Sequence, residues 1–121
     1  MDKNSILIVD DEKLIIKALK ANLTREGFNV STAENVDQAL AVIQSKQIDI
    51  MLSDYILGNI TGLELLKQTK KYHPDIKVIM FSGQKDTLAV EKILAHGADT
   101  FIAKPFGMEK LLEEITALQE Q

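Results

Sequence analysis

Residues 6–11 read Ile-Leu-Ile-Val-Asp-Asp, a short apolar run that ends in two carboxylates. Three later apolar runs end in the same way, at an acid, a hydroxyl and an ammonium group: residues 48–53 before Asp54, residues 78–81 before Ser82, and residues 101–103 before Lys104. In an open α/β sheet, ligands bind outside the carboxyl ends of the strands. We therefore expect these side chains to meet in one shallow crevice, where they could hold a divalent metal ion and a phosphoryl group.

Strand-like and helix-like segments alternate along the chain. Short apolar runs rich in Ile, Val, Leu and Phe predict strands near residues 5–9, 28–32, 48–53, 77–81 and 99–103. Apolar residues at helical spacing predict helices near residues 12–26, 35–46, 61–72, 85–96 and 107–119. Because right-handed crossovers cover both faces of such a sheet, we expect an α/β fold of five βα units. The sheet would be doubly wound, parallel and five-stranded, in the flavodoxin-like order 2-1-3-4-5.

The composition limits the class of protein. A chain of 121 residues is long enough for one domain with its own core, which we place at residues 1–121. A net charge of −4 and a pI near 5.1 argue against direct binding to nucleic acid. Cysteine is absent, and the N-terminus does not resemble a signal peptide. Because no apolar run approaches the roughly 18 residues of a membrane span, we expect a soluble, cytoplasmic protein without membrane insertion.

The predicted strand order makes the first and third strands neighbours, and so places Asp10 and Asp11 beside Asp54. Two carboxylates about 5 Å apart repel by roughly 3 kcal/mol at an effective dielectric of 20. Either a carboxyl pKa rises or a cation binds. Lys104 brings one positive charge, and Mg²⁺ (or Mn²⁺) would bring the rest. Taken alone, Asp10, Asp11 and Glu12 could simply cap the first helix, but their occurrence together with Asp54 and Lys104 favours the metal site.

Other kinds of phosphate site are not indicated by the sequence. A dinucleotide site would need a glycine-rich loop after the first strand, but residues 10–13 read Asp-Asp-Glu-Lys. This acidic loop would repel a phosphate unless a metal ion lay between them. A Walker motif is absent, and so is the hydroxyl- and amide-rich loop of a flavodoxin-type flavin site.

Four motifs together carry a resemblance to a known family. They are VDDE at 9–12, SDYILGNITGLELL at 53–66, FSG at 81–83 and GADTFIAKPF at 97–106. With these motifs the chain resembles the receiver domain of bacterial two-component response regulators over essentially its whole length. The resemblance implies the flavodoxin-like receiver fold. It also implies a signalling switch that catalyses only its own phosphorylation and dephosphorylation, and no enzyme acting on other substrates.

The resemblance assigns chemical roles to the residues at the first and third strand ends. Asp54 matches the phosphoacceptor, which would take a phosphoryl group from the phosphohistidine of a sensor histidine kinase or phosphotransfer protein. Asp10, Asp11 and Asp54 match the carboxylates that hold Mg²⁺. The backbone carbonyl of Ile56 would complete the protein ligands.

Further matches concern phosphoryl binding and signal transmission. Lys104 matches the lysine that pairs with a phosphoryl oxygen, and Ser82 the hydroxyl that donates to another. Phe101 matches the aromatic switch position and should favour the buried rotamer, although a plain core aromatic is equally compatible with the sequence. Pro105 matches a proline whose preceding peptide bond is usually cis. The signal would leave through the fourth helix, fifth strand and fifth helix to an output domain or a downstream protein.

Two positions match residues that tune hydrolysis in the family, and a third departs from the family pattern. Ile56 and Gln84 match positions that line the approach of the water that hydrolyses the aspartyl phosphate, and the apolar Ile56 should slow that reaction. Gly58 stands where the family often has proline, and glycine should loosen the loop. Two other interpretations stay open: a receiver-like module that docks partners without phosphorylation, and an aspartate-nucleophile phosphatase. Ile56 disfavours the phosphatase, because such enzymes typically need an aspartate there.

Overall fold

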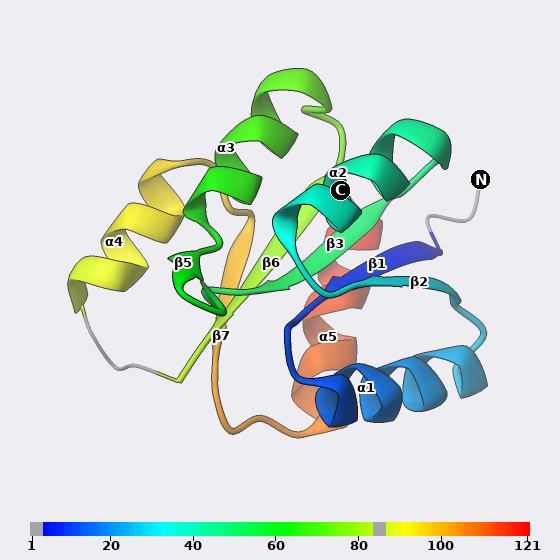
Figure 1. Ribbon diagram of the computed structural model, residues 1–121. Coiled ribbons are helices and arrows are strands. Elements are labelled where there is room, and N and C mark those ends of the chain that lie inside the picture. Colours follow the sequence, from blue (N-terminus) through cyan, green and yellow to red (C-terminus); the bar gives the residue numbers. More distant parts are fainter. Residues whose placement is uncertain (1–3, 84–86) are drawn as a thin grey trace.

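The computed structural model describes residues 4–83 and 87–121. Five parallel strands form one sheet in the order β2-β1-β3-β6-β7, and helices cover both of its faces (Figure 1). The strands of this sheet are β1 (Ser5–Val9), β2 (Asn29–Ala33), β3 (Ile50–Asp54), β6 (Lys77–Ser82) and β7 (Thr100–Ala103). The helices are α1 (Lys13–Arg25), α2 (Val36–Ser45), α3 (Leu63–Tyr72), α4 (Thr87–Ala95) and α5 (Met108–Gln119). The predicted α/β class and strand order are confirmed.

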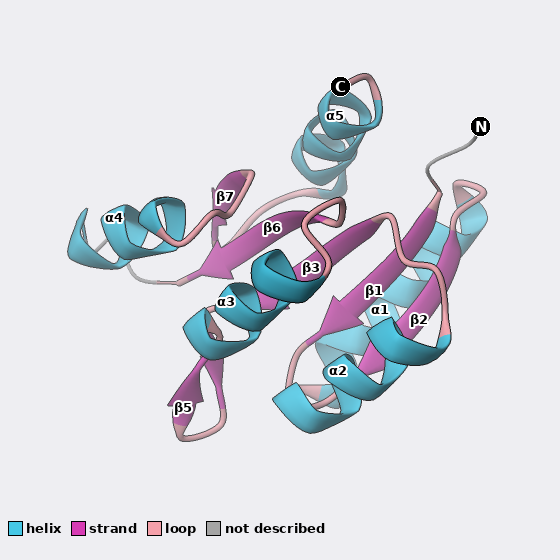
Figure 2. Ribbon diagram, turned by 90° about the horizontal axis from the view of Figure 1, so that it is seen from above, coloured by secondary structure: helices cyan, strands magenta, loops and turns pink. Residues whose placement is uncertain are grey.

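The sheet divides the core into two clusters. The central strand β3 is buried at every residue, which explains why it begins with three consecutive apolar residues and shows no alternation of apolar and polar side chains. Successive residues of a strand point to opposite faces. Leu7 and Val9 of β1 therefore pack under α2, α3 and α4, whereas Ile6 and Ile8 pack under α1 and α5. Figure 2 shows these two helical layers on either side of the sheet.

The helices begin and end close to the predicted positions. The start of α2 is set by Asn35, whose side chain accepts a hydrogen bond from the N–H of Gln38 at 2.8 Å. Among helix starts whose preceding residues are described, the largest difference is at α3, which begins at Leu63 and not near residue 61. Residues 60 and 61 form a short strand instead of the first turn of the helix.

A small antiparallel hairpin, β4 (Ile56–Leu57) and β5 (Ile60–Thr61), follows β3 directly and is absent from the sequence prediction. Strands of two residues are too short to show an alternating pattern. Gly58 and Asn59 form the loop of this hairpin, and Gly58 has a φ of 68°. A glycine with positive φ at the first loop position is typical of a tight hairpin turn. The hairpin therefore begins two residues after Asp54, beside the expected site.

Candidate functional site

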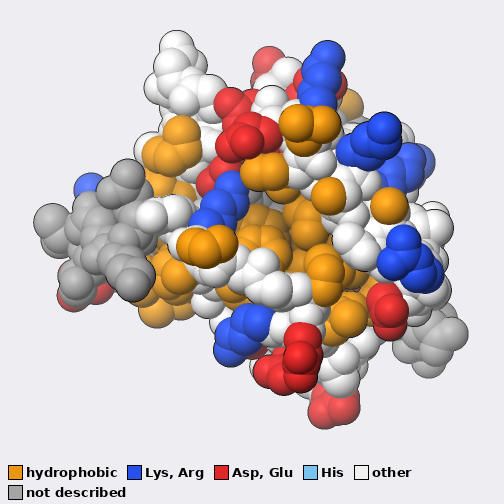
Figure 3. All heavy atoms as spheres, turned by 90° about the horizontal axis from the view of Figure 1, so that it is seen from below, with side chains coloured by type: hydrophobic (Ala, Val, Ile, Leu, Met, Phe, Trp, Pro, Cys, Tyr) orange, Lys and Arg blue, Asp and Glu red, His pale blue; other side chains and the backbone are white. Residues whose placement is uncertain are grey.

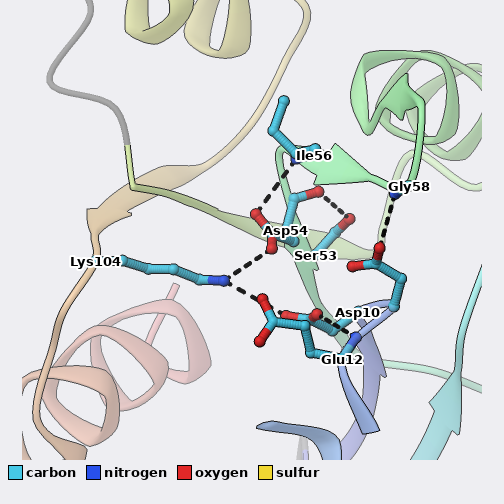
Figure 4. Close-up of polar contacts among 8 residues, drawn as sticks. Asp10, Glu12, Ser53, Asp54, Ile56, Gly58 and Lys104 are labelled. Carbon is cyan, nitrogen blue, oxygen red and sulfur yellow. Dashed lines mark hydrogen bonds and ion pairs between the residues drawn. The ribbon is translucent and has the colours of Figure 1, made fainter.

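The carboxyl ends of neighbouring strands bring the predicted polar residues to one edge of the sheet. Asp10 follows β1, Asp54 ends β3, Ser82 ends β6 and Lys104 follows β7. In the strand register, Asp54 pairs with Phe81, directly before Ser82. Figure 4 shows Asp10, Asp54 and Lys104 pointing toward one another. The crevice expected at the strand ends is therefore built from these residues.

Asp10 is the most enclosed acid of this site, with 1% of its surface exposed. Its Oδ1 accepts a hydrogen bond from the N–H of Glu12 at 2.9 Å. Its Oδ2 lies 3.6 Å from Lys104 Nζ. Within residues 4–83 and 87–121, this Oδ2 is the single buried side-chain oxygen or nitrogen without a hydrogen-bond partner. Burial raises the pKa of Asp10, against the lowering effects of the Glu12 N–H and of Lys104.

The carboxylate of Asp54 lies between two donors. Oδ2 accepts a hydrogen bond from Lys104 Nζ at 2.8 Å, and Oδ1 accepts one from the N–H of Ile56 at 3.3 Å. Asp54 is 7% exposed, so solvent reaches only its edge. Burial acts to lower the pKa of Lys104, but the hydrogen bond and charge of Asp54, with the charge of Asp10, leave that pKa raised. The ammonium group is thus kept charged against two carboxylates.

Three carboxylates stand close enough to share a cation. One oxygen from each of Asp10, Glu12 and Asp54 lies within 4.8 Å of the others. The buried Oδ2 of Asp10 accepts no hydrogen bond, so this oxygen is available to bind a metal ion. Carboxylate oxygens are the ligands that Mg²⁺ and Mn²⁺ prefer. The residues present therefore fit a divalent cation.

Asp11 and Glu12 occupy different surroundings in the structure. Asp11 is exposed, and its Oδ2 accepts a hydrogen bond from the N–H of Gly58 at 3.0 Å. Glu12 is the N-cap residue of α1 but makes no side-chain cap hydrogen bond, so its carboxylate is left with Asp10 and Asp54. The sequence pattern indicates only a cap role for Glu12. The sequence signal that Glu12 could join the carboxylate group is its position directly after two aspartates. Its side-chain direction has no such signal, because residue type does not fix that direction in a turn.

The remaining predicted residues lie around these groups. Ser82 is buried at the end of β6. Phe101 of β7 is partly buried and packs inward against the cluster under α2, α3 and α4. The Lys104–Pro105 peptide bond is cis. The side chain of Ile56 is 45% exposed at the rim of the site. Gln84 lies outside the described residues, and the roles assigned to all of these residues stay predictions.

An apolar groove adjoins the site on the face of α1 and α5. It has a volume of about 580 Å³ and its lining includes Ile15 and Leu19 of α1 and Phe106 and Met108 after β7. Lys104 also lines it, so the groove reaches the edge of the sheet at which Asp10 and Asp54 lie. Figure 3 views the molecule from this side and shows hydrophobic side chains gathered around a hollow.

The sequence matches the family model of the response regulator receiver domain over residues 6–116. The chain belongs to this family. Receiver domains are the signalling switches of two-component systems and bind Mg²⁺ at an acidic pocket. This chain has an acidic group of Asp10, Glu12 and Asp54 at the ends of β1 and β3.

Curated relatives of this receiver domain are much longer proteins. It is 34% identical over 121 residues to the DNA-binding transcriptional regulator NtrC of Salmonella typhimurium, which covers 100% of this chain and 25% of that protein. It is 35% identical over 112 residues to a cyclic di-GMP phosphodiesterase of Thermotoga maritima, covering 93% of this chain and 30% of that protein. The chain therefore spans about a quarter to a third of these relatives, and their names describe activities of whole proteins.

Solved structures share the same fold over nearly the whole receiver domain. A CheY-like response regulator receiver domain protein from Methanospirillum hungatei has a TM-score of 0.91 and 36% identity, covering 97% of this chain and 94% of that chain. The response regulator TrrA from Thermotoga maritima, solved in complex with Mg²⁺-BeF, has a TM-score of 0.85 and 32% identity. That match covers 95% of this chain and 98% of TrrA. Among the described residues, no helix combines the length and the apolar character that a bilayer crossing requires.

Proposed function

We propose that residues 1–121 form a single receiver domain that accepts a phosphoryl group on Asp54. The donor is the phosphohistidine of a sensor histidine kinase or of a phosphotransfer protein. The observation that carries this proposal is the buried Asp54 carboxylate, held by Lys104 at 2.8 Å and flanked by Asp10 with its unpartnered oxygen. The family match over residues 6–116 supports the same assignment.

The reaction needs a nucleophile and compensation of negative charge. A carboxylate oxygen of Asp54 attacks the phosphorus atom, the P–N bond of the donor breaks, and its electron pair leaves with the imidazole. Negative charge on the phosphoryl oxygens is then met by the Lys104 ammonium group and by the hydroxyl of Ser82. The hydrogen bond that Lys104 makes to Asp54 already holds the ammonium group within reach of the attacked phosphorus. Hydrolysis by water later returns Asp54 to its carboxylate form.

For the cation we propose Mg²⁺ or Mn²⁺, bound by Asp10, Asp11, Asp54 and the backbone carbonyl of Ile56. When bound, the ion would screen the carboxylates from the anionic phosphoryl group. Support comes from the oxygens of Asp10 and Asp54 within one group and from the orphaned Oδ2 of Asp10. Glu12 adds a further carboxylate to this neighbourhood.

The donor protein would dock at the apolar groove beside Lys104. A phosphohistidine must come close to Asp54, and an apolar surface next to the site supplies the binding energy for that approach. Leu14 on α1 is 82% exposed and lies one helical turn before Ala18, which lines the groove. These residues give the donor a continuous apolar contact.

The phosphorylated domain would signal through α4, β7 and α5. Phosphorylation adds charge and acceptor oxygens near Ser82. If the Ser82 hydroxyl moves toward them, Phe101 of β7 can pack further inward, because it is only partly buried before the reaction. The reader of this face would be an output domain or a downstream protein. Relatives in which the receiver fills about a quarter of the chain leave room for such a domain.

The test of this function is the intact mass of the protein after incubation with Mg²⁺ and acetyl phosphate or phosphoramidate. We expect one phosphoryl adduct, which is lost in Asp54→Asn and in EDTA. The matched control is Asp37→Asn, which makes the same chemical change in the first turn of α2 and should keep the adduct. The absence of an adduct with both donors would favour the module that docks partners without phosphorylation.

A further inference from the structure

The hydrogen bond between Asp11 and Gly58 links two parts of the chain that are 47 residues apart. Asp11 Oδ2 accepts it from the Gly58 N–H at 3.0 Å, and Figure 4 shows Gly58 at the tip of the hairpin with this bond drawn. Asp11 is not part of the group formed by Asp10, Glu12 and Asp54. The hairpin β4–β5 therefore holds a carboxylate that would otherwise be free to join the cation site.

Charge repulsion explains why Asp11 lies on the hairpin. Asp10, Glu12 and Asp54 already crowd three carboxylates within 4.8 Å, with Lys104 as the ammonium group that faces them. A fourth carboxylate would add repulsion to each of the others. The hydrogen bond from the Gly58 N–H holds the Asp11 carboxylate outside this group. Without a cation, this arrangement is the favourable one.

Gly58 is able to make this bond because of its backbone. Its φ of 68° turns the tip of the hairpin between Leu57 and Ile60, a conformation that glycine adopts without strain. Proline fixes φ near −65° and has no N–H, so it could neither form this turn nor donate to Asp11. The expected loosening of the loop by Gly58 is therefore offset by strand pairing and by the bond to Asp11.

We infer that the Asp11–Gly58 hydrogen bond is a latch that opens when a divalent cation binds. The cation competes for the same carboxylate, Asp11 turns from Gly58 toward Asp10 and Asp54, and the hairpin tip loses its contact. The hairpin tip is then held by Asp11 when the site is empty and released when the site holds a cation. The coupling is reciprocal, so weakening the latch strengthens cation binding. This inference rests on the cation site of the proposed function.

Amide hydrogen exchange of Gly58, followed by NMR, tests the latch directly. Without Mg²⁺ we expect the Gly58 N–H to be protected, and with saturating Mg²⁺ its exchange should become about fivefold faster or more, as for the loss of one exposed hydrogen bond to a charge. In Asp11→Ala the exchange should be fast with and without Mg²⁺. If Mg²⁺ binds and the Gly58 N–H stays protected, the latch is wrong although the cation site stands. If Mg²⁺ does not bind at all, the proposed function and the latch both fail.

Substitutions at Gly58 test the latch, and because proline also disrupts the turn, the same substitution in an Asp11→Ala background separates the latch from a general effect on the loop. Gly58→Pro removes the donor, whereas Gly58→Asn keeps it and tolerates a positive φ. We expect Gly58→Pro to bind Mg²⁺ about threefold to tenfold more tightly by calorimetry, with Gly58→Asn close to the wild type. The gain from Gly58→Pro should vanish in the Asp11→Ala background. A weaker affinity in Gly58→Pro, or a gain that persists without Asp11, would overturn the inference.

Discussion

At the scale of single residues, Asp10 is a buried carboxylate that lowers the stability of the protein and belongs to the proposed cation site. It is almost fully buried, yet one of its oxygens lacks a hydrogen-bond donor. Burial raises its pKa above the usual 3.8. Between 3.8 and the raised value, folded Asp10 keeps its proton while the unfolded chain has lost it. The contribution of Asp10 to stability therefore falls as the pH rises through this range and is least favourable above it.

The first prediction is that Asp10→Asn stabilises the metal-free protein at pH 7. Asparagine keeps the acceptor for the Glu12 N–H and removes a buried charge, so we expect a gain on the order of 1 kcal/mol, or about 4 °C in Tm. The gain should shrink as the pH is lowered through the raised pKa, where the wild-type carboxyl becomes neutral. Thermal melts in EDTA between pH 4 and pH 8 measure this. If the Tm of the two proteins changed with pH in the same way, the buried charge of Asp10 would not lower stability.

A second prediction concerns Ile56 at the rim of the site. Its exposed apolar side chain offers no hydrogen bond to a water that approaches the aspartyl phosphate. Ile56→Asn should therefore shorten the phosphoryl lifetime several-fold, because a polar side chain can orient the attacking water. Ile60→Asn is the matched control, since Ile60 is 49% exposed on the other strand of the hairpin, against 45% for Ile56. Equal lifetimes in wild type and Ile56→Asn would exclude this role.

At the scale of elements, the packing of α3 against β3 positions Asp54, the proposed phosphoacceptor. A Cβ placed on Gly62, the N-cap residue of α3, would lie 2.5 Å from the Asp54 carbonyl oxygen and 3.1 Å from Met80 Cε. The backbone of Gly62 is ordinary, with φ −73°, so glycine is needed here for space and not for its conformational range. The close approach holds the start of α3 against the end of β3.

The third prediction follows from this contact. Gly62→Ala should destabilise the protein by about 2 kcal/mol, because a backbone carbonyl in a central strand cannot easily move away. Gly107→Ala is a matched control, since Gly107 is the N-cap residue of α5 and nothing lies within 4 Å of its Cβ position. That variant should change stability by less than about 1 kcal/mol. Urea unfolding of both variants measures the difference, and equal effects would contradict the steric account.

At the scale of the whole molecule, the proposed cation site would draw on residues from the beginning, the middle and the end of the chain. Asp10 follows the first strand, Asp54 ends a strand in the middle of the chain and Lys104 follows the last strand. A ligand that binds only when these segments are assembled stabilises the folded state as a unit. The metal-free protein lacks this stabilisation and carries the repulsion among its carboxylates.

The fourth prediction is therefore a dependence of global stability on Mg²⁺. The Tm should rise with the logarithm of the Mg²⁺ concentration, with a gain of about 2.7 kcal/mol at one hundred times the dissociation constant. Asp10→Ala should lose most of this dependence. Sodium chloride at equal ionic strength controls for screening of surface charges. A rise in Tm that salt reproduces would argue against a specific site.

Much of this architecture can be predicted from the sequence, but not all of the site. Continuous apolar runs predict the central strands, because both faces of β1, β3 and β6 are buried. The hairpin β4–β5 has no such signal, since two residues per strand cannot display a period. The surroundings of the Asp11 and Glu12 side chains are equally hidden, because they depend on Gly58 and on the start of α1.

The amino-acid sequence alone determined the order of the elements and the placement of Asp10, Asp54, Ser82 and Lys104 at strand ends. These follow from local periodicity and from the rule that parallel strands end at one edge. Only the tertiary structure decided that Asp10 is buried with an oxygen that accepts no hydrogen bond, that Lys104 donates its hydrogen bond to Asp54 and not to Asp10, and that Asp11 is held by Gly58. These contacts join residues 47 and 50 positions apart, so they depend on how distant segments pack and on where each side chain points.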